Sequence, residues 1–135
     1  MTAYDTNNIF AKILRGEIPC HKVYEDEHTF AFMDIRPIQP GHVLVVPRRE
    51  VAYLFDMAPA EQEALWKAVR TVEAGVRKAT GCKRVCLVVV GWEVPHVHVH
   101  LVPTSHASEF PVPPKLKQTE AQLTTTAAAI RAALR

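Results

Sequence analysis

Apolar residues recur at spacings of three and four between Pro59 and Gly81, which is the pattern of a long helix with one buried side. The apolar positions of this segment are Leu65, Val69, Val72, Val76 and Ala79. Proline suits the first turn of a helix, and glycine suits the left-handed residue that ends one. The sequence therefore predicts one long helix between these two residues, packed on the core along its apolar side.

Two shorter helices are predicted near the ends of the chain. The first follows Asn7 or Asn8, either of which can cap it, and stops at Gly16. Its apolar positions are Ile9, Phe10, Ile13 and Leu14. The second follows Thr119, which has the spacing of a capping box with Gln122. Its apolar positions are Leu123, Ala127, Ile130 and Leu134.

Short apolar and alternating runs between the helices are typical of strands. The expected strands cover residues 22–25, 29–33, 42–47, 85–90 and 97–102. The first two are expected to form a hairpin around Asp26 and Glu27, and the β-branched run 85–90 is expected to be a central strand. Because the strands come in groups with one long helix between them, the sequence predicts an antiparallel α+β fold.

The composition narrows the function classes. Sixteen basic and 14 acidic residues give a net charge of +2, which is too balanced for a protein devoted to nucleic acid. The central apolar run, residues 85–91, is far shorter than a membrane span, and residues 1–8 contain no apolar signal segment. We therefore expect a cytoplasmic protein with no nucleic acid and no membrane among its partners.

The three cysteines also indicate a cytoplasmic protein. An odd number, without the density of a disulfide scaffold, is typical of reduced thiols in the cytosol. Cys82 and Cys86 lie four residues apart, and no second pair accompanies them. A zinc site built on these cysteines is therefore not expected.

Three histidines alternate with apolar residues near the end of the strand-rich region. Side chains of a strand point to opposite faces with a period of two, so His96, His98 and His100 are expected to share one face. Val97 and Val99, with Leu101 after them, would face the core. Buried imidazoles need a partner for each ring nitrogen, so three of them on one face are hard to explain by packing alone.

Three interpretations of this histidine face compete. A solvated histidine-rich strand is disfavoured by the valines between the histidines. A metal site on His96, His98 and His100 is conceivable because imidazole is a common metal ligand, but no carboxylate or cysteine stands at a matching spacing nearby. Phosphate chemistry, with one imidazole as nucleophile and its neighbours holding the anion, is the interpretation we favour.

The histidine segment and several other blocks of the chain resemble a known family. Residues 96–102 match, residue for residue, the signature of the histidine triad (HIT) proteins, and the likeness is greatest to the Hint-type branch. Further blocks in the right order lie at residues 9–19, 30–35 and 40–47, and the resemblance spans residues 7–104. It implies a HIT-like antiparallel sheet with a long helix and a short N-terminal helix, to which this chain adds a C-terminal helix.

The resemblance also implies a reaction and its residues. In such proteins the middle histidine, here His98, attacks the α-phosphorus of a nucleoside phosphoramidate or polyphosphate, and water then releases the monophosphate from a covalent nucleotidyl-histidine. His100 matches the position that contacts the phosphate and leaving group, while His96 and His42 match supporting positions. Asp34 matches an aspartate that binds both ribose hydroxyls. The apolar positions around a purine base are matched by Ile9, Phe10, Ile13, Phe32 and Ile35. No cofactor and no metal ion are implied.

Plainer interpretations of these residues stay open. Asp34 stands beside a proline-rich loop and could simply form a turn. His42 could be a histidine at a strand end that is satisfied by local hydrogen bonds. The five apolar residues could belong to the core rather than to a pocket.

The loop before the triad departs from the Hint-type pattern. That branch usually carries an asparagine, a glycine-rich loop and a glutamine there, whereas this chain has a shortened loop with Trp92 and Glu93. A carboxylate beside a phosphate site is repulsive unless it is paired or turned away. The expected function is therefore a nucleotide hydrolase, and the alternative is a nucleotide-binding regulatory protein with vestigial catalysis.

The domain plan follows from the same blocks. Residues 1–104 are expected to form the HIT domain, and residues 105–135 to add a proline-containing linker and a helix that are part of the same domain. A sheet with a long exposed edge invites pairing with a second copy, and Hint-type proteins form a continuous sheet across a two-fold axis. A homodimer with a purine nucleotide substrate is therefore expected.

Overall fold

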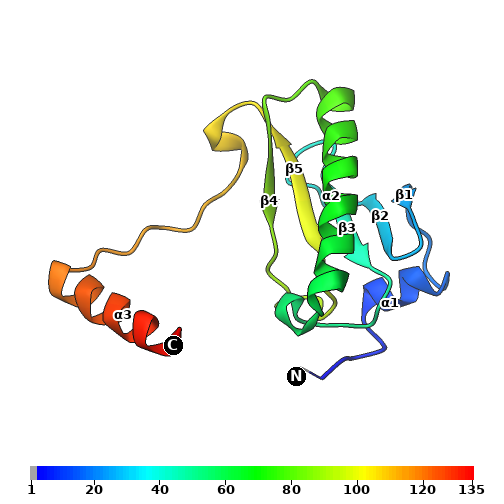
Figure 1. Cartoon of the computed structure of the whole chain (residues 1–135). Coiled ribbons are helices and arrows are strands. Elements are labelled where there is room, and N and C mark those ends of the chain that lie inside the picture. The colour runs from blue at the N-terminus through cyan, green and yellow to red at the C-terminus, as the bar shows by residue number, and fades with distance from the viewer. Residues whose placement is uncertain (1–2) are drawn as a thin grey trace.

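The computed structural model describes residues 3–135 and contains a five-stranded antiparallel sheet with strand order β1-β2-β3-β5-β4 (Figure 1). The strands are β1 (Lys22–Glu25), β2 (Thr29–Met33), β3 (Val43–Pro47), β4 (Arg84–Val88) and β5 (Val99–Thr104). The helices are α1 (Ile9–Leu14), α2 (Pro59–Thr80) and α3 (Glu120–Ala133), and η1 (Leu54–Asp56) and η2 (Ala107–Glu109) are short 3-10 helices. The predicted antiparallel α+β fold is confirmed.

The long helix α2 covers one face of the sheet (Figure 1). Pro59 stands at its first position, the Glu61 carboxylate accepts the Ala58 N–H, and Gly81 ends the helix in the left-handed region with φ 68°. Its buried residues are Leu65, Ala68, Val69, Val72 and Val76. Ala79 is exposed, contrary to the prediction.

The opposite face of the sheet is covered by α1. Alternation along β3 sends Val43 and Val45 toward α2, and Leu44 and Val46 to the other side. There they form a second cluster with Phe10 and Phe32, as α1 packs against the sheet. The side-chain oxygen of Asn8 accepts the Ala11 N–H, as expected of an N-cap. Because α1 has only six residues, part of this face is left for a cavity.

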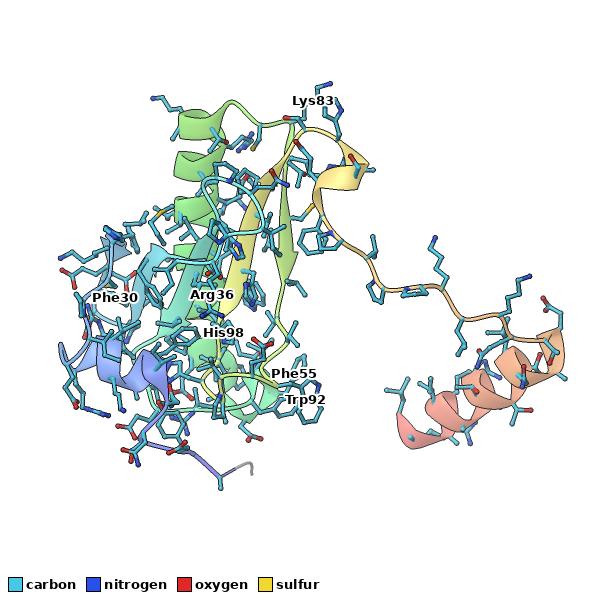
Figure 2. All side chains as sticks on the ribbon, turned by 180° about the vertical axis from the view of Figure 1, so that it is seen from behind. Phe30, Arg36, Phe55, Lys83, Trp92 and His98 are labelled. Carbon is cyan, nitrogen blue, oxygen red and sulfur yellow. The ribbon has the colours of Figure 1, made fainter. Side chains whose placement is uncertain are left out.

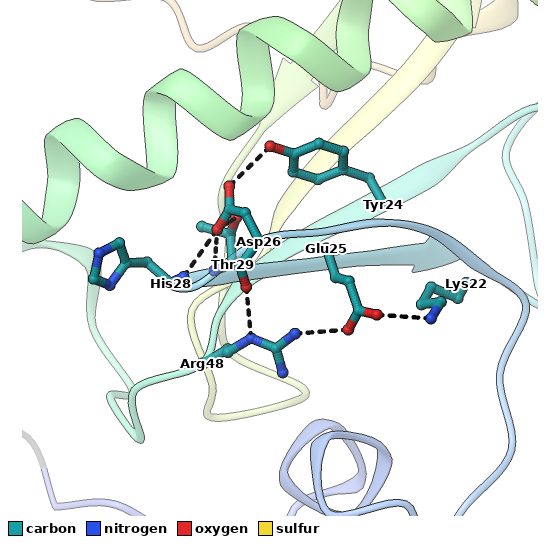
Figure 3. Close-up of polar contacts among 7 residues, drawn as sticks. All are labelled: Lys22, Tyr24, Glu25, Asp26, His28, Thr29 and Arg48. Atoms are coloured by element: carbon teal, nitrogen blue, oxygen red, sulfur yellow. Dashed lines mark hydrogen bonds and ion pairs between the residues drawn. The ribbon is translucent and has the colours of Figure 1, made fainter.

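The β1–β2 hairpin forms where it is predicted, and Asp26 explains its tight turn (Figure 3). One carboxylate oxygen accepts the N–H groups of His28 and Thr29 and the Thr29 hydroxyl, and the other accepts the Tyr24 hydroxyl. Partial burial opposes ionisation, but these bonds outweigh it and lower the pKa of Asp26 to about 2. Arg48 at the end of β3 binds the Asp26 carbonyl and the Glu25 carboxylate, which ties the turn to the sheet.

Two strand predictions need correction. The run expected as a central strand is β4, which pairs only with β5 among the described residues and leaves Leu87 exposed. The strand expected from residue 97 is β5, which begins at Val99. Just before β5, the Val97 N–H donates to the Val51 carbonyl at 2.9 Å and not to a neighbouring strand of the sheet.

Beyond the sheet, the chain runs through η2 and an extended linker to α3, which lies apart from the sheet and α2 (Figure 1). Thr119 and Gln122 form the predicted capping box. Every residue from 111 to 135 is exposed, including Leu123 and Ile130 on the apolar side of α3. Among residues 3–135, no helix is both long enough and apolar enough to cross a membrane.

Candidate active site

A cavity of about 750 Å³ opens on the α1 face of the sheet. Its wall is formed by α1 and the chain that follows it, by the end of β2, by the loop before the triad, and by His98 and His100. Leu44 pairs with both Phe32 and His100 across the sheet, so these three side chains form a row on the same face. The sheet register thereby brings apolar wall and imidazole together.

His98 lines this cavity, and one of its ring nitrogens is unprotonated. Its Nδ1 lies 2.6 Å from the backbone oxygen of His96, and because a carbonyl only accepts, Nδ1 must carry the hydrogen. Nε2 then has a free lone pair. Burial lowers the pKa of His98, and the bond to His96 and the charges of Asp34 and Glu93 offset this only in part. The imidazole is therefore neutral near pH 7, as a nucleophile must be.

His100 presents the opposite group, an N–H, as a chain of hydrogen bonds determines. The Ile38 N–H donates to His42 Nδ1 at 3.0 Å, so the hydrogen of neutral His42 sits on Nε2. That Nε2 lies 3.0 Å from His100 Nδ1 and donates to it. His100 Nε2 must then carry a hydrogen. Burial, with His98 and His42 nearby, lowers the pKa of His100 to about 4, so the ring is neutral.

His96 is fully buried and does not line the cavity. Its Nε2 donates to the Pro47 carbonyl at 2.9 Å, so its Nδ1 accepts, and the Tyr4 hydroxyl donates to it at 2.6 Å. With both nitrogens bonded, the ring fixes the backbone whose carbonyl holds His98. Burial lowers the pKa of His96 to about 4. Tyr4 lies outside every motif, so no sequence pattern indicated it; the folded N-terminal segment reveals its role.

Asp34 follows β2 and lines the cavity. One of its carboxylate oxygens accepts the Arg36 N–H at 2.8 Å, and the other lies 3.5 Å from His42 Nε2. The turn contact that a plain interpretation expects is therefore present. The same residue also faces the site.

The five apolar residues proposed to surround the base all line the cavity, and they do so in two ways. Phe10 and Phe32 are buried and belong to the core as well, and the Phe10 ring lies edge-on 4.8 Å from the His98 ring. Ile9, Ile13 and Ile35 are more open. Lining residues that the sequence analysis did not select are Ile18, Pro19, Cys20, Met33, Arg36, Leu44, Val90, Gly91 and Val94. Met33 and Arg36 directly adjoin selected residues, and Gly91 and Val94 adjoin Trp92 and Glu93, so adjacency in the chain is an indication for these four.

The shortened loop forms the β4 side of the cavity. Trp92 and Glu93 both line it, and Trp92 is 91% exposed at its rim (Figure 2). Gly91 has φ 83°, a conformation that side-chain-bearing residues rarely adopt, so glycine is required for the turn.

The geometry disfavours a metal centre. Within residues 3–135, ligand atoms of Asp34, His42 and His100 lie within 4.8 Å of one another. A metal needs a lone pair on each ligand nitrogen, but His42 Nε2 carries the hydrogen as long as its Nδ1 accepts the Ile38 N–H. In the set of three triad histidines, both nitrogens of His96 are already used in hydrogen bonds.

The chain matches the HIT domain family over residues 15–107. An uncharacterized HIT-like protein of Azospirillum brasilense is 44% identical over 105 residues, which cover 73% of this chain and 86% of that protein. The asymmetrical bis(5'-nucleosyl)-tetraphosphatase of Schizosaccharomyces pombe is 38% identical over 89 residues, 62% of this chain and 49% of the enzyme. The crystal structure of a HIT family protein from Bacillus anthracis superposes with a TM-score of 0.82 at 30% identity, covering 98% of this chain and 100% of that chain.

Proposed function

Because the chain belongs to the HIT family, whose members include nucleotide hydrolases and transferases, we propose that it attacks the α-phosphate of nucleoside phosphoramidates or related nucleotide esters. One observation carries the proposal: His98 and His100 face the same cavity in opposite tautomers. One ring offers a lone pair and its neighbour offers an N–H. Nucleophilic attack on phosphorus needs the first, and the charge that develops on the phosphate oxygens needs the second.

The reaction proceeds in two displacements. The lone pair of His98 Nε2 forms a bond to phosphorus, and the bond from phosphorus to the leaving group breaks with its electron pair going to that group. The leaving group takes a proton from solvent, and a water oxygen then attacks phosphorus and gives its proton back to solvent. The N–P bond breaks, its pair returns to Nε2, and nucleoside monophosphate departs. His100 Nε2–H stabilises the phosphate oxygens in both steps.

The rest of the cavity fits a nucleoside. Ile9, Phe10 and Ile13 of α1, with Phe32 and Ile35 near the end of β2, offer an apolar wall for a purine base. Asp34 lies between this wall and the imidazoles, where its carboxylate can accept hydrogen bonds from ribose hydroxyls. These assignments extend the proposal from the reacting atoms to the substrate.

A regulatory nucleotide-binding protein with vestigial catalysis is the second candidate, and the loop with Trp92 and Glu93 favours it. A panel of nucleoside phosphoramidates and dinucleoside polyphosphates, incubated with the protein in the presence of a chelator, separates the two. We expect release of monophosphate at a rate that the chelator does not change. Nucleotide binding without any release would support the regulatory function instead.

The homodimer belongs to the same proposal. β4 leaves one edge unpaired among the described residues, with Leu87 exposed, and a second copy could continue the sheet there. Residues 111–135 are all exposed, so within residues 3–135 of one chain they have no surface to pack on. In the dimer, residues 105–135 would pack on the second copy and so become part of the same domain. The superposition on the Bacillus anthracis protein covers 98% of this chain and so includes α3, which supports this detached placement.

A cytoplasmic location completes the proposal. Cys20, Cys82 and Cys86 are all free, as expected of thiols kept in a reducing compartment.

A further inference from the structure

The charges of the cavity are unusual for a site that receives a phosphate. Besides the imidazoles, the charged side chains that line it among residues 3–135 are Asp34, Arg36 and Glu93. The lining of the cavity therefore contains two carboxylates and one guanidinium. A substrate with several phosphates would bring further negative charge into a cavity that already has an excess of it.

Glu93 is the carboxylate without a partner. Within residues 3–135 no hydrogen bond or ion pair reaches its side chain, whereas Asp34 is bonded to the Arg36 N–H and lies close to His42. Its charge nevertheless reaches the reacting group, since it acts against the burial that lowers the pKa of His98. The carboxylate therefore stands ready to pair with a cation brought by a ligand.

The two carboxylates flank the histidines from opposite sides. Asp34 follows β2 and Glu93 lies in the loop between β4 and β5, while β3 and β5 separate β2 from β4 in the sheet. The apolar wall for the base lies on the side of α1 and β2. A nucleotide whose phosphorus meets His98 would then place its leaving group on the side of Glu93 and Trp92.

We propose that Glu93 selects substrates by the charge of the leaving group, favouring one that bears an ammonium or other cation over polyphosphates and carboxylate-bearing groups. This inference rests on the proposed function and adds the substrate class that the site accepts. Exposed Trp92 beside Glu93 adds an aromatic face on which such a cation can lie.

Three adenosine phosphoramidates test the inference. They share one alkylamine leaving group and differ at its far end, which bears an ammonium, a hydroxyl or a carboxylate. For the parent protein we expect kcat/KM for the ammonium substrate to exceed that for the hydroxyl substrate about threefold to fivefold, the size of a solvent-exposed ion pair. The carboxylate substrate should fall below the hydroxyl substrate, and added salt should compress all three values.

The decisive quantity is the ratio of the ammonium to the hydroxyl substrate within each variant. Glu93→Gln should bring this ratio close to one, and Glu93→Lys should invert it. Glu63→Gln, the same charge change on the exposed side of α2, should keep the parent ratio. A ratio that Glu93→Gln leaves unchanged would overturn the inference while the proposed function stands. No turnover of any of the three by the parent would overturn the proposed function and this inference with it.

Discussion

The imidazoles of the site differ because each ring has different hydrogen-bond partners. His98 donates from Nδ1 to a carbonyl and keeps a lone pair on Nε2, whereas His100 accepts at Nδ1 from His42 and keeps a hydrogen on Nε2. Burial lowers the pKa of both, so both are neutral near pH 7. In the proposed reaction, attack by His98 and anion stabilisation by His100 would thus need no change of tautomer.

Tyr4→Phe tests the support beneath His98. The change removes only the hydroxyl that donates to His96 Nδ1, so a fully buried nitrogen loses its partner. We expect the free energy of unfolding to fall by about 1–2 kcal/mol in urea titrations. We also expect kcat to fall with little change in KM, because the His96 carbonyl positions the nucleophile and not the substrate. Tyr53→Phe at an exposed tyrosine is the control. A variant with parental kcat would show that Tyr4 has no positioning role.

Asp34→Ala tests recognition of the ribose. Loss of hydrogen bonds to a charged acceptor should weaken nucleotide binding by about 1.5–3 kcal/mol in calorimetric titrations. A 2',3'-dideoxy nucleotide lacks both hydroxyls and should bind the variant and the parent nearly equally. If the variant discriminates against the dideoxy nucleotide as strongly as the parent does, Asp34 acts only through its turn contact with Arg36.

At the scale of elements, the sequence predicted the features that depend on neighbouring residues, such as where a helix begins and ends. The caps Asn8 and Thr119 and the terminator Gly81 stand directly next to the helices they bound, so those limits were predictable from neighbouring residues. The position of β4 at the edge was not, since an apolar run does not show how many neighbours a strand has. The start of β5 depends on the contact between Val97 and Val51, which are far apart in the chain.

The residues of the candidate site also divide into those that a sequence motif predicts and those that depend on contacts between distant segments. The triad and Asp34 stand in motifs, and the structure brings His98, His100, Asp34 and the five apolar residues to one cavity. His42 could be placed by resemblance, but its hydrogen-bonded link to His100 depends on the register of β3 and β5. The hydrogen bond from Tyr4 to His96 depends on how the N-terminal segment folds back over His96, and no short-range sequence pattern encodes that path.

The β1–β2 hairpin yields a prediction about pH. The pKa of Asp26 is about 2 in the folded protein and about 4 when unfolded, so its ionised form stabilises the fold. This contribution is present above pH 4 and is lost as the pH falls from 4 toward 2. Because the side chain is exposed, we expect this contribution to the free energy of unfolding to be about 1 kcal/mol. Asp26→Asn should show that loss at pH 7 in urea titrations, and its difference from the parent should shrink toward pH 2. A difference independent of pH would contradict this account.

At the scale of the whole molecule, two of the surfaces open to solvent within residues 3–135 matter for assembly. One is the edge of β4, and the other is the apolar side of α3 with Leu123 and Ile130. A 14-residue helix is marginally stable alone in water, so α3 needs a surface to pack on. We expect a second copy of the chain to supply the surface on which each α3 packs.

Light scattering should therefore give a mass of about 30 kDa, twice the 15.1 kDa of the chain. The double change Leu123→Asp with Ile130→Asp should raise the dimer dissociation constant at least about tenfold, because it places charge on the apolar side of α3. Thr125→Asp, on the other side of the same helix, is the control and should leave the dimer intact. A parent protein that is monomeric at micromolar concentration would rule out the dimer.

The central claim is that His98 carries the nucleotide during the reaction. The most direct measurement is to mix the protein with an adenosine phosphoramidate, quench with base within milliseconds, and determine the mass of the intact protein and its peptides. We expect an acid-labile nucleotidyl adduct on His98 in the parent and in His21→Ala, a change at an exposed histidine. His98→Ala should keep the fold and nucleotide binding, form no adduct and lose nearly all turnover. Full turnover by His98→Ala, or turnover by the parent with no adduct at any time, would contradict the account.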